Sequence, residues 1–181
     1  MKNVLLIVDP QVDFITGTLA VSHAEEKMNK LIDWIIANKP EQVFVTMDSH
    51  PENHCSFAVN GGQWPVHCVE NTPGWEVYRP LRILGPMEHF MKGRNANKEE
   101  YSIFQNNDHG DELYNELLEL QGSEEGVNIY VAGIAGDYCV MNTLQDLETL
   151  GFKDNIIVIK DCVASIDEEV FTNFINSWKT I

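Results

Sequence analysis

The stretch GIAGDYCV, residues 133–140, lies between two segments of different hydrophobic periodicity. Residues 127–132 form an apolar run typical of a buried strand, whereas leucines at helical spacing follow in residues 141–150. Cys139 is therefore expected at a strand-to-helix turn, where unpaired N–H groups and the helix dipole favour negative charge. Such a turn can lower the pKa of a cysteine and stabilise an oxyanion. Taken alone, Cys139 is better explained as a small buried packing residue, because free cysteines are among the most buried residue types.

Strand-like apolar runs recur along the chain and alternate with segments of helical periodicity. Further strands are expected at residues 3–8, 43–47, 87–91 and 155–159, and further helices at 22–38, 111–120 and 168–178. This alternation predicts an α/β fold, a three-layer α/β/α sandwich around a mainly parallel sheet. Residues 49–84 show no sustained period, and an irregular stretch of that length in a compact domain is often functional.

The overall composition limits the class of protein and its partners. The 181 residues are expected to form one domain, 1–181, because no linker or repeat divides them. A net charge of −16 argues against a nucleic-acid partner and against binding to anionic membranes. Four cysteines without CxxC spacing indicate a reducing compartment. With neither a signal-peptide pattern nor an apolar run long enough to span a membrane, a cytoplasmic protein is expected.

Charged residues follow the ends of several predicted strands. Asp9, Asp48 and Lys92 each stand where a strand ends, as does the turn that carries Cys139. The carboxyl ends of parallel strands meet at one edge of a sheet, which is where open α/β folds place their ligand sites. A charged residue at a strand end is often there only because the strand reaches solvent at that point. The pattern alone therefore favours neither a shared site nor a merely solvated edge.

A second group of polar residues has the composition of a metal site. Asp48, His50 and His67 offer one carboxylate and two imidazoles, a set that suits zinc, iron or manganese. Asp48 and His50 are two residues apart, so both side chains would lean to the same face of a continuing strand. His54 is either a fourth ligand or a supporting residue. The alternative is a set of loop histidines on a polar surface.

Several segments, in order along the chain, match one enzyme family. They are LLIVDPQVDFITGTLAV at 5–21, TMDSHPENHCSF at 46–57, WPVHCV at 64–69, KG at 92–93, YSIF at 101–104 and GIAGDYCV at 133–140. With these segments the chain resembles the nicotinamidase and pyrazinamidase branch of the isochorismatase-like cysteine hydrolases. Each segment is weakly informative alone, whereas the ordered set is specific.

The resemblance implies a role for each matching residue. It implies a catalytic set of Asp9, Lys92 and Cys139, and a metal site formed by Asp48, His50 and His67. It implies one divalent ion there, Zn²⁺ first, with Fe²⁺ or Mn²⁺ as alternatives, and leaves the role of His54 open. It also implies substrate contacts from Phe14, Trp64, Tyr101 and Ala135, an oxyanion site at the N–H groups of Ala135 and Cys139, and a cis bond between Ala135 and Gly136.

The activity implied by the resemblance is hydrolysis of nicotinamide to nicotinate and ammonia, in NAD salvage, through a thioester on Cys139. The expected partner is a small carboxamide, and relatives are often homo-oligomers. Two departures concern positions thought to border the pocket: Ser49 replaces the family's usual tryptophan, and Gly136 replaces a frequent threonine. The alternatives are another hydrolase of the family, acting on an N-carbamoyl compound, a different amide or an isochorismate-type vinyl ether, and a non-catalytic α/β binding subunit. The last would be expected to lack at least one of Asp9, Lys92 and Cys139.

Overall fold

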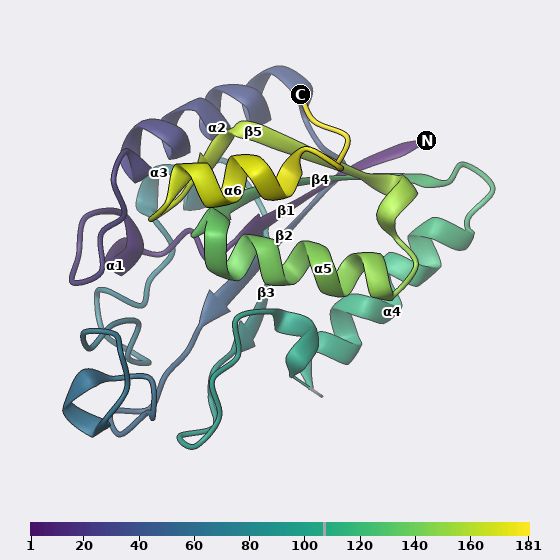
Figure 1. Ribbon diagram of the computed structural model, residues 1–181. Helices are drawn as coiled ribbons and strands as arrows, with labels where there is room; N and C mark the ends of the chain where they lie inside the picture. The colour runs from purple at the N-terminus through teal and green to yellow at the C-terminus, as the bar shows by residue number, and fades with distance from the viewer. Residues whose placement is uncertain (107) are drawn as a thin grey trace.

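The computed structural model describes residues 1–106 and 108–181 and contains a five-stranded sheet. Every strand pairing in this sheet is parallel, and the strand order is β3-β2-β1-β4-β5 (Figure 1). The strands are β1 (Lys2–Val8), β2 (Gln42–Asp48), β3 (Glu88–Lys92), β4 (Val127–Ile134) and β5 (Ile156–Ala164). The predicted α/β class and mainly parallel sheet are confirmed.

Helices cover both faces of the sheet (Figure 1). The helices are α1 (Val12–Ile15), α2 (Ala24–Asn38), α3 (Arg79–Arg82), α4 (His109–Gly122), α5 (Met141–Thr149) and α6 (Glu168–Ile175). One hydrophobic core joins α4, α5 and α6 to one face, and the other joins α1, α2 and α3 to the opposite face. Side chains of β1 alternate between these two cores, with Leu6 in the first and Leu5 in the second, both fully buried. The three-layer sandwich follows from strands that are apolar on both faces.

Some element boundaries differ from the sequence-based prediction. Strand β5 continues to Ala164, beyond the expected 155–159, although it contains the exposed pair Lys160 and Asp161. Helices α1 and α3 are four residues long, too short for the 3.6-residue period to reveal. The last helix ends at Ile175 rather than Trp178, and the chain then forms a bridge from Thr180 to β5.

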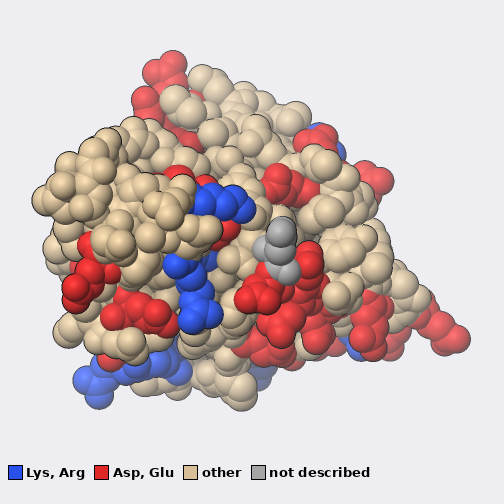
Figure 2. All heavy atoms as spheres, turned by 90° about the horizontal axis from the view of Figure 1, so that it is seen from below, with Lys and Arg blue, Asp and Glu red and all other residues tan. Residues whose placement is uncertain are grey.

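The outer surface carries the excess of acid that the composition requires. Figure 2 shows clustered acidic side chains with interspersed basic ones on the face viewed from below. Among the helices of the described residues, none combines the length and apolarity needed to cross a membrane.

Strand β4 carries a glycine where it pairs with β1 beside the predicted site. Gly133 pairs in register with Val8, and its φ is +131°. A Cβ atom at Gly133 would lie 2.1 Å from the carbonyl oxygen of Val8, which is backbone in the centre of the sheet. The backbone of a central strand cannot move away without breaking its neighbours' hydrogen bonds. Only glycine therefore fits this position.

We expect Gly133→Ala to lower the free energy of unfolding by about 2 kcal/mol or more, because a side chain there forces the backbones apart. Urea denaturation measures the change. Gly122→Ala is the matched control, since a Cβ at Gly122 meets no atom within 4 Å and its φ is not in the left-handed region. The control is expected to change stability by less than about 0.5 kcal/mol. Equal stability of the two variants would contradict the steric argument.

Candidate active site

The predicted catalytic residues meet at the carboxyl edge of the sheet. Asp9 directly follows β1, and Lys92 is the last residue of β3. Asp48 is the last residue of β2 and pairs in register with Lys92. Cys139 lies in a π-helical turn, η3 (Gly136–Val140), that links β4 to α5. The sheet edge thus brings together four side chains that are up to 130 residues apart in the sequence (139 − 9).

Lys92 is the centre of this group. Its side chain is fully buried, and its Nζ lies 2.9 Å from Asp9 Oδ2 and 2.5 Å from Asp48 Oδ1. The same Nζ lies 3.7 Å from the Sγ of Cys139. An unpaired ammonium in this position would be costly, so the two carboxylates are needed to keep it charged.

The environment changes the proton affinity of each group. Burial raises the pKa of the Cys139 thiol well above its ordinary value, and this outweighs the opposing charge of Lys92. Burial also raises the pKa of Asp9, against the lowering effect of Lys92. Burial acts to lower the pKa of Lys92, but Asp48 and Asp9 raise it well above its ordinary value. The free protein therefore holds a protonated lysine and a protonated thiol.

The prediction of a lowered pKa at Cys139 is wrong in direction. Cys139 lies inside the turn, only 6% exposed, and the neighbouring carboxylates of Asp9 and Asp48 disfavour a thiolate. The expected position of the cis peptide is also wrong, because the cis bond joins Ile134 to Ala135, one bond earlier. The sequence pattern contains no signal that separates these two adjacent bonds.

Asp9 is held in place by a residue that the sequence analysis missed. The hydroxyl of Thr46 donates a 2.7 Å hydrogen bond to Asp9 Oδ1, and the Asp9 N–H donates to the Thr46 carbonyl at 3.1 Å. The second carboxylate oxygen of Asp9 remains directed at Lys92. In the sequence Thr46 is simply another β-branched residue of a strand, so nothing there distinguishes it.

The predicted metal ligands also lie together. One ligand atom from each of Asp48, His50 and His67 falls within 4.8 Å of the others. His50 Nδ1 bonds the Gly93 carbonyl at 2.9 Å, and His67 Nδ1 bonds the Pro65 carbonyl at 2.7 Å. A carbonyl can only accept, so each ring donates from Nδ1, and in its neutral form it offers the lone pair of Nε2 to a metal.

Two observations support a metal at these residues. Nε2 of His50 is buried and, among the described residues, has no hydrogen-bond partner. Imidazoles that donate from one nitrogen to a carbonyl and leave the other free are typical of metal-binding histidines. One carboxylate and two imidazoles fit a divalent ion such as zinc, and the residues present therefore suit the implied metal.

His54 is positioned to support the site. Its ring stacks on His50 with centroids 4.0 Å apart, and its Nδ1 and Nε2 are engaged by Ser56 Oγ at 2.7 Å and the Lys98 carbonyl at 3.1 Å. Both nitrogens are thus occupied within the protein. Glu99, which the sequence analysis missed, has a carboxylate oxygen within 4.8 Å of ligand atoms of His50 and His54. It belongs to a run of polar loop residues, where the sequence offers no reason to select it.

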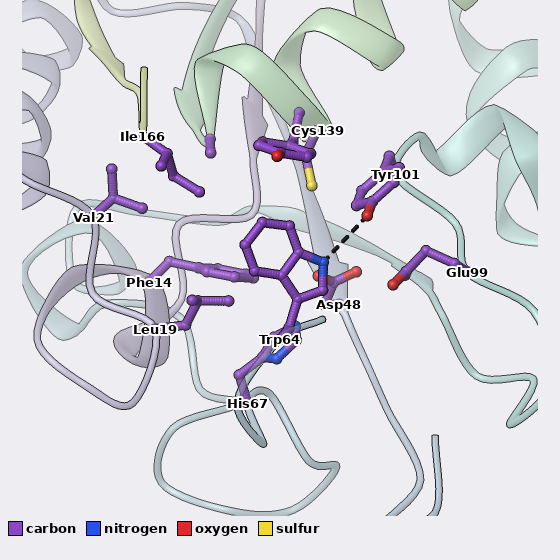
Figure 3. A pocket seen from close by; sticks show the side chains of 12 residues that line it. Phe14, Leu19, Val21, Asp48, Trp64, His67, Glu99, Tyr101, Cys139 and Ile166 are labelled. Atoms are coloured by element: carbon purple, nitrogen blue, oxygen red, sulfur yellow. Dashed lines mark hydrogen bonds between the residues drawn. The ribbon is translucent and has the colours of Figure 1, made fainter. Parts of the chain in front are cut away.

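A pocket opens next to these two groups of residues (Figure 3). It encloses about 380 Å³, open mouth included, and Figure 3 shows the Cys139 sulfur pointing into it. The predicted residues Phe14, Trp64, Tyr101 and Ala135 all line it. The Trp64 indole N–H donates to the Tyr101 hydroxyl at 3.2 Å, which ties two walls of the pocket together (Figure 3). Aromatic walls beside a thiol suit a small planar ligand.

Other lining residues were missed by the sequence analysis: Leu19, Val21, Glu99, Tyr138 and Ile166. The aliphatic members look like ordinary core residues in the sequence.

The two departures from the family pattern do not line the pocket, contrary to expectation. Ser49 is buried and its hydroxyl accepts a 3.1 Å hydrogen bond from the indole of Trp75. Gly136 faces Ser165, whose Oγ would be 2.1 Å from an added Cβ.

Comparison with known proteins gives a consistent result. The model of the isochorismatase domain matches residues 3–179. The nicotinamidase of Escherichia coli is 35% identical over 172 residues, which cover 84% of this chain and 79% of that protein. The crystal structure of the pyrazinamidase of Pyrococcus horikoshii in complex with zinc superposes with a TM-score of 0.82 at 30% identity. The superposition covers 100% of this chain and 99% of that one.

A third match is the structure of PnC1 from L. infantum in complex with nicotinate. It has a TM-score of 0.85 at 27% identity, over 99% of this chain and 92% of that one. Family model, sequence relatives and solved structures agree over nearly the whole chain. The chain therefore belongs to the isochorismatase family, in the branch that contains the nicotinamidases and pyrazinamidases.

Proposed function

We propose that this protein hydrolyses nicotinamide to nicotinate and ammonia, with Cys139 as the nucleophile. One observation carries the proposal: the Lys92 ammonium lies within 3.7 Å of both Asp9 and the Cys139 sulfur, and Cys139 lines an aromatic pocket. A base, a cation and a thiol in one water-poor cluster are what attack on an unactivated amide requires. Relatives named nicotinamidase support the choice of amide.

In the first step Asp9 removes the thiol proton and the sulfur attacks the carboxamide carbon. A carboxylate oxygen of Asp9 lies within 4.8 Å of Sγ, and its raised pKa makes it a better base. Lys92 stays cationic and stabilises the thiolate that forms during attack. The carbonyl oxygen becomes an oxyanion, for which we assign the N–H groups of Ala135 and Cys139 as donors.

In the second step Asp9 gives the proton to the amide nitrogen, the C–N bond breaks and ammonia leaves. The acyl group is then held as a thioester on Cys139. A water molecule gives a proton to Asp9 and attacks the thioester carbon, and the C–S bond breaks. The sulfur takes the proton back from Asp9, which leaves nicotinic acid, ionised on release, and the original enzyme.

The pocket and the metal site orient the substrate. Asp48, His50 and His67 would hold one divalent ion, with zinc preferred and Fe²⁺ or Mn²⁺ as alternatives. When bound, that ion supplies a Lewis-acid contact for the nitrogen of the pyridine ring. The rings of Phe14 and Trp64 then confine the aromatic ring of the substrate, so that its carboxamide faces Cys139. The zinc complex of the Pyrococcus relative supports this assignment.

The remaining expectations stay predictions. We propose that residues 1–181 act as one domain, that the protein is cytoplasmic and serves NAD salvage, and that it forms homo-oligomers as relatives often do. Pyrazinamide is a second candidate substrate, because solved structures with the same fold are named pyrazinamidases. A non-catalytic subunit is disfavoured by the intact cluster of Asp9, Lys92 and Cys139. Ammonia release across nicotinamide, pyrazinamide and N-carbamoyl compounds separates the candidates.

Cys139→Ala should reduce ammonia release from nicotinamide by at least about 10³-fold, because the variant has no atom that can form the thioester. Metal content, measured by elemental analysis, should remain that of the unaltered protein. Cys162→Ala is the matched control, since Cys162 is equally buried but lies in the core and does not line the pocket. Turnover by the Cys139 variant at the level of this control would refute the nucleophile assignment.

Removal of the metal tests the second part of the proposal. Dialysis against a chelator should abolish ammonia release, because the substrate ring loses the contact that orients it. Addition of one equivalent of Zn²⁺, Fe²⁺ or Mn²⁺ should restore the activity, and comparison of the three identifies the preferred ion. Full activity in protein shown by elemental analysis to be free of metal would contradict the assignment of Asp48, His50 and His67.

A further inference from the structure

Gln11 lies between β1 and α1 and is fully buried outside the pocket. Its amide makes three hydrogen bonds, each of 2.8 Å. The Oε1 atom accepts from the Asp48 N–H, while Nε2 donates to the carbonyls of Asp48 and Trp75. Both amide protons and the oxygen are therefore used. One side chain thus holds both backbone polar groups of Asp48.

The sheet explains why Asp48 needs this help. Pairing of β1 with β2 ends at Val8 and Thr46, two residues before Asp48. On its other side, β2 remains paired with β3 as far as Asp48 and Lys92. The Asp48 backbone groups that face β1 thus lie beyond the end of that strand. The amide of Gln11 occupies the place of the missing peptide group and extends the ladder by one step.

Asp48 belongs to both parts of the site. Its Oδ1 lies 2.5 Å from Lys92, and its Oδ2 lies 3.7 Å from Nε2 of His50. Its carboxylate must therefore be fixed in direction as well as in position. A backbone that is free to rotate at the end of a strand would not hold that direction against the pull of Lys92.

We infer that Gln11 is a positioning residue that sets the geometry and affinity of the metal site through the Asp48 backbone. The inference rests on the metal site of the proposed function. Gln11 does not line the pocket, and two of its three side-chain hydrogen bonds go to the Asp48 backbone, which is its link to the metal site. Residues that support metal ligands by hydrogen bonding typically contribute 10–100-fold to metal affinity.

Gln11→Met tests this inference, because methionine preserves the length and approximate volume of the side chain and removes the three hydrogen bonds. Gln121→Met is the matched control. The Gln121 amide also bonds within the protein, to Gly151 and Asn155, but it does so on α4, which does not line the pocket. The probe is Co²⁺, with affinity measured by competition against a chromophoric chelator and geometry by the visible spectrum at saturation.

We expect Gln11→Met to bind Co²⁺ about 10–100-fold more weakly than the unaltered protein and to show a changed spectrum at saturation. Gln121→Met should match the unaltered protein in both measurements. Circular dichroism of the metal-free proteins establishes that each variant is folded. If Gln11→Met does not fold, Gln11→Asn keeps the amide but withdraws it by one methylene, and the same loss is expected.

Equal Co²⁺ affinity and spectrum in a folded Gln11 variant and the unaltered protein would overturn the inference while leaving the proposed metal site intact. An equal loss in Gln121→Met would also overturn it, because the effect would then reflect general destabilisation. An unaltered protein that binds no Co²⁺ would overturn the metal site and this inference together.

Discussion

The ion cluster around Lys92 is the interaction on which the rest of the site depends. A fully buried ammonium is stable only with opposite charge beside it, and here Asp9 and Asp48 both supply it. The positions of the two carboxylates are fixed by the ends of neighbouring strands, so the sheet determines the electrostatics. The thiol of Cys139 therefore lies beside a lysine, Lys92, whose pKa is raised so that it stays charged. It also lies beside Asp9, whose pKa is raised by burial.

This arrangement places two tasks on one residue. Asp48 faces Lys92 with one oxygen and His50 with the other, so the ion cluster and the predicted metal site share this carboxylate. Burial acts to raise the pKa of Asp48, but Lys92 and His50 lower it below the ordinary range, and the carboxylate stays ionised. Thr46 holds the carboxylate of Asp9 and Gln11 holds the backbone of Asp48, each by hydrogen bonds from a neighbouring segment of the chain.

The fold and the main chemical groups could be predicted from the sequence because both depend on the types of residues and on their order along the chain. Apolar runs on both faces of a strand indicate a parallel sheet, and the order of elements then places Asp9, Asp48 and Lys92 at one edge. The supporting residues depend on contacts that no local pattern encodes. Gln11 reaches Asp48 across 37 positions of the chain, and Glu99 enters the site from an irregular loop.

The pKa of Cys139 could not be predicted for a related reason. A strand-to-helix turn is recognisable in the sequence, whereas the burial of the sulfur and its two carboxylate neighbours depends on the assembled fold. The same limit applies to Leu19, Val21 and Ile166, which become pocket residues only through the position of the loops.

The strand order has a consequence for the nascent chain. Strand β1 is synthesised first and is fully apolar from Val4 to Val8, yet it lies in the middle of the sheet. Its second neighbour, β4, begins only at Val127, so one edge of β1 stays unpaired until most of the chain has left the ribosome. During that interval the strand presents an open hydrophobic edge of the kind that aggregates and that chaperones bind. The strand order therefore makes β1 the strand of this sheet that waits longest for its second neighbour during synthesis.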